Sequence, residues 1–232
     1  MTRIKKKELG IGVFLLVTFA IVMVMIFMPM PILDGGNTLN YLDNLYNSIS
    51  KGSAYYIPKV EHLVEEHGSE VVTLNLKLDD SRTAQATEPL FVQAGATTAV
   101  EGATLMVNGD LETIFEICLE DAESAYNNLG EDLVARYGTD ARTTLYDWWQ
   151  ALGAMEKDLN RQKLFAAAQL TLTVQAKTVE CAYNYYGIEA QAIKDRWGMV
   201  LFSLVFYVIY TIWYGYGIMF VFEGLGFELA AH

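Results

Sequence analysis

Two long stretches without a charged side chain dominate the hydropathy pattern of this chain. The first runs from Leu9 to Met28 and the second from Trp197 to Phe222. A helix of about 20 apolar residues crosses the hydrocarbon core of a bilayer, so each stretch can span a membrane with some tilt. The pattern predicts a mainly α membrane protein, with two transmembrane helices flanking a folded domain.

The residues before the first stretch indicate how the chain is oriented. They include four basic side chains and no acid before Glu8: Arg3, Lys5, Lys6 and Lys7. The positive-inside rule places such a segment in the cytoplasm. A cleaved secretory signal is the alternative. The apolar run has full bilayer length and lacks a small-x-small cleavage site, which favours an uncleaved signal anchor.

This orientation assigns a compartment to every part of the chain. Residues 1–8 are cytoplasmic, residues 9–28 and 197–222 cross the bilayer, and residues 34–195 form an extracytoplasmic domain. Residues 223–232 then form a short cytoplasmic tail. We expect the protein to lie in the cytoplasmic membrane of a prokaryote, with its main domain outside, in the periplasm or its equivalent.

The middle of the domain has the pattern of a small sheet. Side chains alternate between apolar and polar from Val72 to Leu78, which predicts a strand. Two further strands, Thr97–Val100 and Thr104–Val107, flank a glycine turn at Gly102 and predict a hairpin. A helix is expected between the first strand and the hairpin, and another from Leu111 to about residue 129. The sequence therefore predicts a βαββα layer at about residues 70–130, with two helices on one face of the sheet.

The rest of this domain has the period of amphipathic helices. One helix is predicted from residue 38 to residue 49, and a second ends at Gly68. After Gly138 the chain is expected to be helical, with a break at Gly187. Four side chains are predicted to form the buried face of the first helix in this part: Leu145, Trp148, Trp149 and Leu152.

A row of hydroxyl-bearing and small residues lies within the second apolar stretch. Helical spacing places five residues on one face: Ser203, Tyr207, Tyr210, Tyr214 and Gly217. A hydroxyl group in hydrocarbon is unfavourable unless it forms a hydrogen bond. We therefore expect this face to pack against other integral membrane subunits.

The charge distribution narrows the range of partners. The 232 residues carry a formal net charge of −12, which excludes a basic footprint for nucleic acid. Residues 34–195 hold 25 acidic and 11 basic side chains. Four acids spaced three or four apart share one predicted helix face: Glu112, Glu116, Glu120 and Glu123. This face is a candidate surface for a basic extracytoplasmic protein or for divalent cations; an ordinary solvated helix face is the alternative.

Candidate chemistry is sparse. His62, Glu65 and His67 are the nearest approach to a metal site, but the two histidines are five residues apart. The zinc hydrolase motif spaces them four apart, on one helix face. A solvated helix end is the alternative. Cys118 and Cys181 are too few for a disulfide framework or a four-cysteine zinc site, and they lie outside any CxxC motif. We expect no catalytic residue and no cofactor.

The layout suggests a part of a larger assembly. Two spans around a helical outer domain resemble bacterial chemoreceptors and sensor kinases, which continue into a signalling module after the second span. Only residues 223–232 follow here. We therefore expect a non-catalytic accessory subunit of a membrane complex, whose acidic domain docks a partner. The alternatives are a ligand sensor that signals through a separate protein, and an extracytoplasmic enzyme or metal-binding protein.

Overall fold

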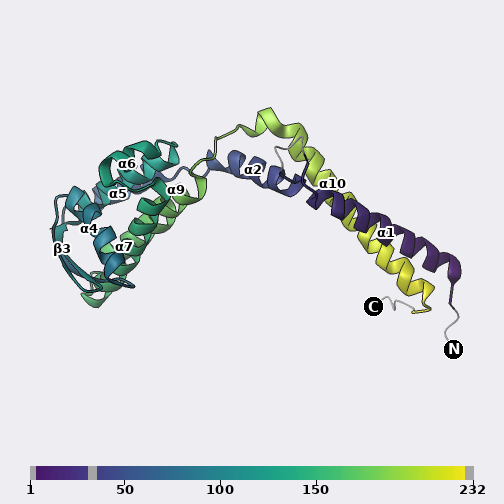
Figure 1. Ribbon diagram of the computed structural model, residues 1–232, viewed down its shortest axis with the longest axis horizontal. Coiled ribbons are helices and arrows are strands. Elements are labelled where there is room, and N and C mark those ends of the chain that lie inside the picture. Colours follow the sequence, from purple (N-terminus) through teal and green to yellow (C-terminus); the bar gives the residue numbers. More distant parts are fainter. Residues whose placement is uncertain (1–3, 31–35, 228–232) are drawn as a thin grey trace. The chain divides into compact units, whose positions relative to one another are not determined.

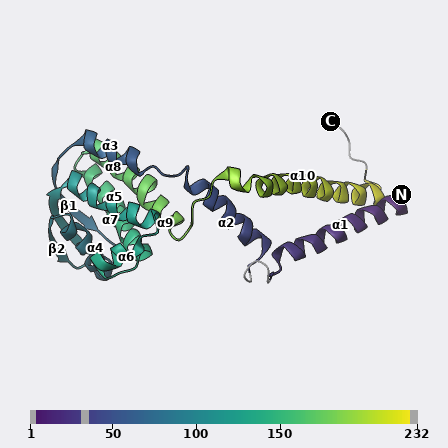
Figure 2. The ribbon, with the colours of Figure 1, turned by 90° about the horizontal axis from the view of Figure 1, so that it is seen from above.

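The computed structural model describes residues 4–30 and 36–227 (Figures 1 and 2). The contacts divide the chain into two compact units. One unit combines the chain up to Ser50 with the chain from Ala190 onward, and the other is Lys51–Glu189. The second unit is a folded domain, which lies inside the range 34–195 that the sequence assigns to the extracytoplasmic part.

Among its described residues, the first unit consists of three helices: α1 (Lys6–Phe27), α2 (Thr38–Lys51, whose last residue belongs to the domain) and α10 (Ile193–Gly224). Both α1 and α10 are long and apolar enough to cross a membrane, and only 6% of the most apolar window of each is buried. The two apolar stretches of the sequence are thus helical as predicted. Asn37 caps α2, because its side chain accepts a hydrogen bond from the Asn40 amide at 2.9 Å.

The domain contains a three-stranded antiparallel sheet in the order β1-β3-β2. Its strands are β1 (Val71–Lys77), β2 (Thr97–Glu101) and β3 (Thr104–Asp110). The side chains of Val72, Leu74 and Leu76 point into the core, whereas the alternate residues of β1 are exposed. One face of the sheet is therefore buried and the other is open, as the alternating sequence predicts.

Seven α-helices and a π-helical segment complete the domain within the described residues. They are α3 (Ile57–His67), α4 (Ser81–Gln93), α5 (Leu111–Tyr126), α6 (Gly130–Tyr137), α7 (Ala141–Arg161), α8 (Phe165–Val174), the π-helical segment Gln175–Val179 and α9 (Glu180–Tyr185). Three aspartates cap α4, α5 and α7 by accepting hydrogen bonds from the first-turn amides: Asp80, Asp110 and Asp140. The predicted βαββα order is confirmed.

The helices cover the buried face of the sheet (Figure 2). Both α4 and α5 lie on this face, as predicted, and α7 packs along β1. Phe91 of α4 meets Trp148 of α7 edge to face, with their ring centroids 5.7 Å apart. The prediction that Trp149 is buried was wrong, because 41% of its surface is exposed. Adjacent helical residues point about 100° apart, so α7 cannot bury both tryptophans against the same neighbour.

Side chains of α7 cover the outer edge of β1. The Asn75 amide donates to Asp158 Oδ2 at 3.0 Å, and Gln162 Nε2 donates to the Thr73 carbonyl at 2.8 Å. These contacts take the positions that a further strand would occupy. An open strand edge invites pairing with another chain, so α7 protects the sheet on this side.

A buried carboxylate joins α5, α6 and α7. The Asp121 side chain is fully buried and accepts hydrogen bonds from Arg136 Nη1 (2.7 Å), Tyr137 Oη (2.6 Å) and Trp148 Nε1 (2.8 Å). Three donors and one opposite charge satisfy this carboxylate, which would be strongly unfavourable here without them. The group therefore fixes how the three helices pack.

Hydrogen bonds join the part of the domain where the chain enters to the part where it leaves. Lys51 Nζ donates to the carbonyls of Ile188 (2.7 Å) and Tyr185 (3.3 Å). Asn128 donates to the Ile188 carbonyl at 3.1 Å and accepts from the Gly187 amide at 2.7 Å. Burial lowers the pKa of the Lys51 ammonium. These bonds hold the first residue of the domain beside its last ones.

We predict that Asp121→Ala destabilises the domain by about 3–5 kcal/mol, because it leaves the Arg136 charge and two further donors without their acceptor. Chemical denaturation of the full chain in detergent, followed by the near-UV signal of its four tryptophans, which include the buried Trp148, measures this loss. Glu120→Gln is the matched control. It removes a neighbouring exposed carboxylate that lies 3.6 Å from the same arginine, and it should change stability by less than about 1 kcal/mol.

A second buried acid predicts a pH effect. Asp147 is 7% exposed, and burial, together with the charge of Asp140, raises its pKa to about 6. An unfolded aspartate titrates near 3.9, so the folded chain binds the extra proton between about pH 4 and pH 6. The contribution of this group to stability therefore falls as the pH rises through that window.

We predict that Asp147→Asn stabilises the protein at pH 7.5, relative to its effect at pH 4, by on the order of 1–2 kcal/mol. Denaturation of both proteins at the two pH values gives this double difference, in which the pH-independent effect of the amide cancels. A double difference of zero, or one of opposite sign, would contradict the raised pKa.

Candidate functional site

The candidate site is the pair of apolar helices α1 and α10, which pack antiparallel (Figure 1). Three glycines allow this close packing. Gly12 of α1 and Gly224 of α10 each lie against the backbone of the other helix, and Gly217 of α10 makes room for the Leu16 side chain. A Cβ atom on Gly12 would lie 2.6 Å from the Val221 amide nitrogen, and one on Gly217 would lie 2.7 Å from Leu16 Cδ2. Small residues at such contacts are typical of helix pairs in membranes, where close van der Waals packing drives association.

Polar contacts close one end of the pair. The Lys5 amide donates to the Gly224 carbonyl at 2.9 Å, and Lys5 Nζ lies 3.0 Å from Glu223 Oε1. Both side chains of the ion pair are about half exposed, so the pair contributes at most about 1 kcal/mol in water. Glu223 ends the apolar stretch of α10, and Lys5, the residue before α1, compensates its charge.

Aromatic contacts join the middle of the two helices. The Phe19 ring stacks on Tyr210 with a centroid distance of 5.5 Å, and it lies 5.1 Å from the ring of Tyr214. Phe19 also meets Trp213 edge to face at 6.4 Å. Three members of the predicted tyrosine face, Tyr210, Tyr214 and Gly217, thus contact α1 of the same chain. Part of the face that the sequence assigns to another subunit is therefore covered internally.

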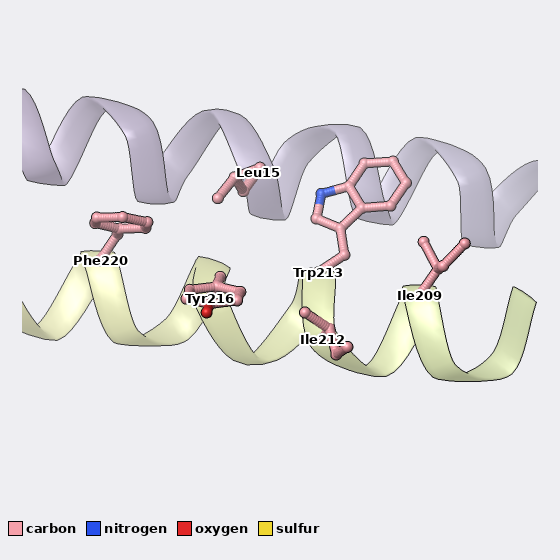
Figure 3. Close-up of a pocket in the computed structure, with 6 residues that line it drawn as sticks. All are labelled: Leu15, Ile209, Ile212, Trp213, Tyr216 and Phe220. Carbon is pink, nitrogen blue, oxygen red and sulfur yellow. The ribbon is translucent and has the colours of Figure 1, made fainter. Parts of the chain in front are cut away.

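An open apolar groove of about 400 Å³ runs beside this contact (Figure 3). Leu15 of α1 lines it together with side chains of α10, and Figure 3 shows the indole of Trp213 between the two helices. Trp213 Nε1 is buried and has no hydrogen-bond partner among the residues that the structure describes. A donor left in this condition costs about 1–3 kcal/mol.

Ser203 and Tyr207 complete the tyrosine face, and they differ in whether the described residues supply a hydrogen-bond partner. Ser203 Oγ is 2.5 Å from Tyr46 Oη, so α2 provides its partner. Tyr207 is 62% exposed and Tyr214 is 46% exposed. They are seven residues apart, which is close to two helical turns, so their side chains point in nearly the same direction. These two rings form the exposed part of the face.

The predicted acidic residues of α5 lie on one helix, and a further carboxylate, Glu61 of α3, lies near them. Tyr55 Oη donates to Glu123 Oε1 at 2.5 Å, and Glu120 lies 3.6 Å from Arg136. Burial and the charges of Glu112 and Glu120 raise the pKa of Glu116. Glu61 of α3 contributes to this shift as well. Sequence spacing could not add Glu61 to the face, because only the packing of α3 on α5 brings it there.

The histidine candidates do not converge. His62 Nδ1 lies 3.6 Å from Glu66, whereas His67 Nε2 lies 3.0 Å from Glu70. Glu65 joins neither pair, and within residues 4–30 and 36–227 no three or more metal-ligating side chains (His, Cys, Asp or Glu) gather as for an ion. Both cysteines are free thiols: Cys118 is buried and Cys181 is half-buried.

Comparison with known proteins identifies no family for this chain. No family model, no curated protein and no solved structure matched the chain. The site therefore has to be interpreted from its own geometry. The residues that sequence reasoning missed are those that touch across the helix pair, namely Gly12, Phe19, Trp213 and Gly224.

We predict that Gly217→Leu separates α1 from α10, because the new side chain would occupy the space of Leu16. Overpacking of this kind costs about 1–3 kcal/mol. Dipolar broadening between spin labels at Val17 and Ile212, in a Cys181→Ser background, measures the separation of the helices in detergent.

Gly215→Leu is the control for this prediction. No atom lies within 4 Å of a Cβ placed at Gly215, so this variant adds the same side chain to the same helix without a clash. Equal broadening in the two variants would show that the packing at Gly217 is not as close as described.

Proposed function

We propose that this protein is a non-catalytic subunit of a membrane protein complex, held in the bilayer by the hairpin of α1 and α10. The observation that carries the proposal is a pair of tyrosines on one flank of α10. Tyr207 is 62% exposed, and Tyr214 is 46% exposed although its ring also contacts Phe19 of α1. A partner helix that supplies hydrogen-bond acceptors and close packing would cover both rings.

The depth of these tyrosines supports a protein partner. Tyr207 is ten residues from Trp197, or about 15 Å along a helix, and Tyr214 is eight residues from Phe222, or about 12 Å. If residues 197–222 span the bilayer, both rings begin well inside the hydrocarbon layer, beyond the interfacial belt where tyrosine is common. Interhelical hydrogen bonds in membranes are worth about 0.6–2 kcal/mol each, so two hydroxyls give a modest but specific contribution.

The orientation follows from the charges next to the helices. The basic residues up to Lys7 support a topology with the N-terminus and residues 223–232 in the cytoplasm and the domain Lys51–Glu189 on the outer side of a prokaryotic inner membrane. The proposed role of that domain is to dock an extracytoplasmic partner, such as an electron carrier or a transport component. The excess of acidic side chains, concentrated on α5 and α3, favours a basic partner through electrostatic steering.

We predict that the double variant Tyr207→Phe, Tyr214→Phe weakens assembly, and that replacing Tyr207, Tyr210 and Tyr214 with leucine abolishes it. Loss of the hydroxyls removes the interhelical hydrogen bonds but leaves the rings and the α1 contacts in place. The test is purification of the tagged full chain in mild detergent, with mass analysis of the subunits that remain bound at a fixed ratio.

Tyr216→Phe is the matched control, because Tyr216 is equally exposed but lies nine residues from Tyr207, on the opposite flank of α10. It should retain every subunit. Assembly that survives the triple leucine variant would overturn the proposed interface. A wild-type chain that purifies alone or as a homodimer would overturn the subunit role itself.

A further inference from the structure

The folded domain carries an aromatic groove that the proposed role does not use. The groove lies between α7 and α9 and has a volume of about 300 Å³. Tyr146 and Trp149 of α7 and Tyr183 of α9 line it, and each is between 37% and 50% exposed. The rings of Tyr146 and Trp149 stack with their centroids 6.0 Å apart.

One carboxylate lies in the wall of this groove. Trp149 Nε1 donates to Glu180 Oε1 at 2.8 Å, which holds the carboxylate beside the aromatic rings. Within the described residues Glu180 takes part in no ion pair, and Asn184 is the other polar side chain of the lining. The lining contains no basic residue. The groove therefore presents aromatic faces and a negative charge together.

Core packing does not account for this cluster. Trp148 fills the core from the adjacent position of α7, whereas Trp149 leaves a large apolar surface in water. Isolated exposed aromatic residues are ordinary, but three that converge around a pocket are typical of a binding surface. Trp and Tyr are also the residues that most often dominate the binding energy of an interface.

The chemistry of the lining selects a cation. Aromatic faces attract cations through their quadrupole, and Glu180 adds a direct ionic partner. The domain already contains such contacts, because Lys177 lies 5.1 Å from the ring centroid of Tyr56. At the groove itself, Arg142 of the same chain lies 5.4 Å from the ring centroid of Tyr183, which leaves Tyr146 and Trp149 for a further cation. Residues 51–189 hold 22 acidic and 10 basic side chains, so the field around the groove also favours a positive ligand.

We propose that this groove binds the guanidinium group of an arginine side chain from a partner protein. A planar guanidinium can stack on Trp149 while it donates hydrogen bonds to Glu180 and to the Asn184 carbonyl oxygen. An ammonium group has no planar face to stack and would bind less tightly. The chemistry of the groove does not depend on whether α1 and α10 cross a bilayer.

Fluorine NMR of the full chain in detergent, labelled with 5-fluorotryptophan, tests this proposal. The chain has four tryptophans, and Trp149→Phe identifies the signal of Trp149. The probe is a blocked Gly-Gly-Arg-Gly-Gly peptide, compared with peptides in which lysine or the neutral isostere citrulline replaces arginine. We expect a saturable shift of the Trp149 signal alone, with the arginine peptide binding most tightly and citrulline not binding.

Two variants separate the groove from general charge attraction. Glu180→Gln should weaken the arginine peptide about two- to fivefold, whereas Glu101→Gln makes the same change of net charge in the β-hairpin and should leave binding unchanged. Equal weakening by both variants would overturn the site, as would equal binding of the citrulline or lysine peptide. The absence of a saturable shift at about 10 mM probe would also overturn it.

Discussion

Close contact between two helical backbones is the constraint on which the first unit of this protein depends. Gly12, Gly217 and Gly224 remove the side chains that would hold α1 and α10 apart. Once these three contacts are made, the rotation of α10 about its axis is fixed. Tyr210 and Trp213 then face α1, and Tyr207 points to the side. Tyr214 lies at the border, with its ring near Phe19 and 46% of its surface exposed. The residues that α10 leaves exposed are thus determined by glycines at its contact with α1.

The two units are stabilised in different ways. The domain has a closed apolar core and a buried polar group at Asp121 whose hydrogen bonds are complete. The helix pair buries little of its apolar surface, and among its described residues one indole donor has no acceptor. In water such a pair would be a poor structure, because its exposed valine, isoleucine and phenylalanine side chains would favour association. In hydrocarbon the same side chains need no further cover, and only the polar groups still require partners.

Local patterns in the sequence were enough to predict most elements. The period-2 alternation of β1 and the glycine turn at Gly102 each act within a few residues, and each was confirmed. The apolar lengths of α1 and α10 were equally clear. These features need no knowledge of which elements are neighbours in space.

Features that depend on tertiary neighbours could not be predicted from one sequence. Trp148 and Trp149 are the same residue type with the same helix propensity, and the packing of α7 against α4 and α5 decides that Trp148 is the buried one. Glu61 joins the acidic face because α3 packs on α5. The histidines at 62 and 67 could be discounted from spacing, but their actual partners, Glu66 and Glu70, emerge only from the fold. The same limit applies to the groove of Trp149, which requires α9 beside α7.

The bonds from Lys51 and Asn128 to residues 185–188 have a consequence for how such a protein can change over time. A domain whose first and last residues lie side by side can be regarded as an insertion into a single loop. Its removal or exchange would leave the ends of the surrounding polypeptide close enough to be rejoined by a short link, a condition under which domain insertions are tolerated. The helix pair and the domain can therefore be selected separately, each within its own architecture.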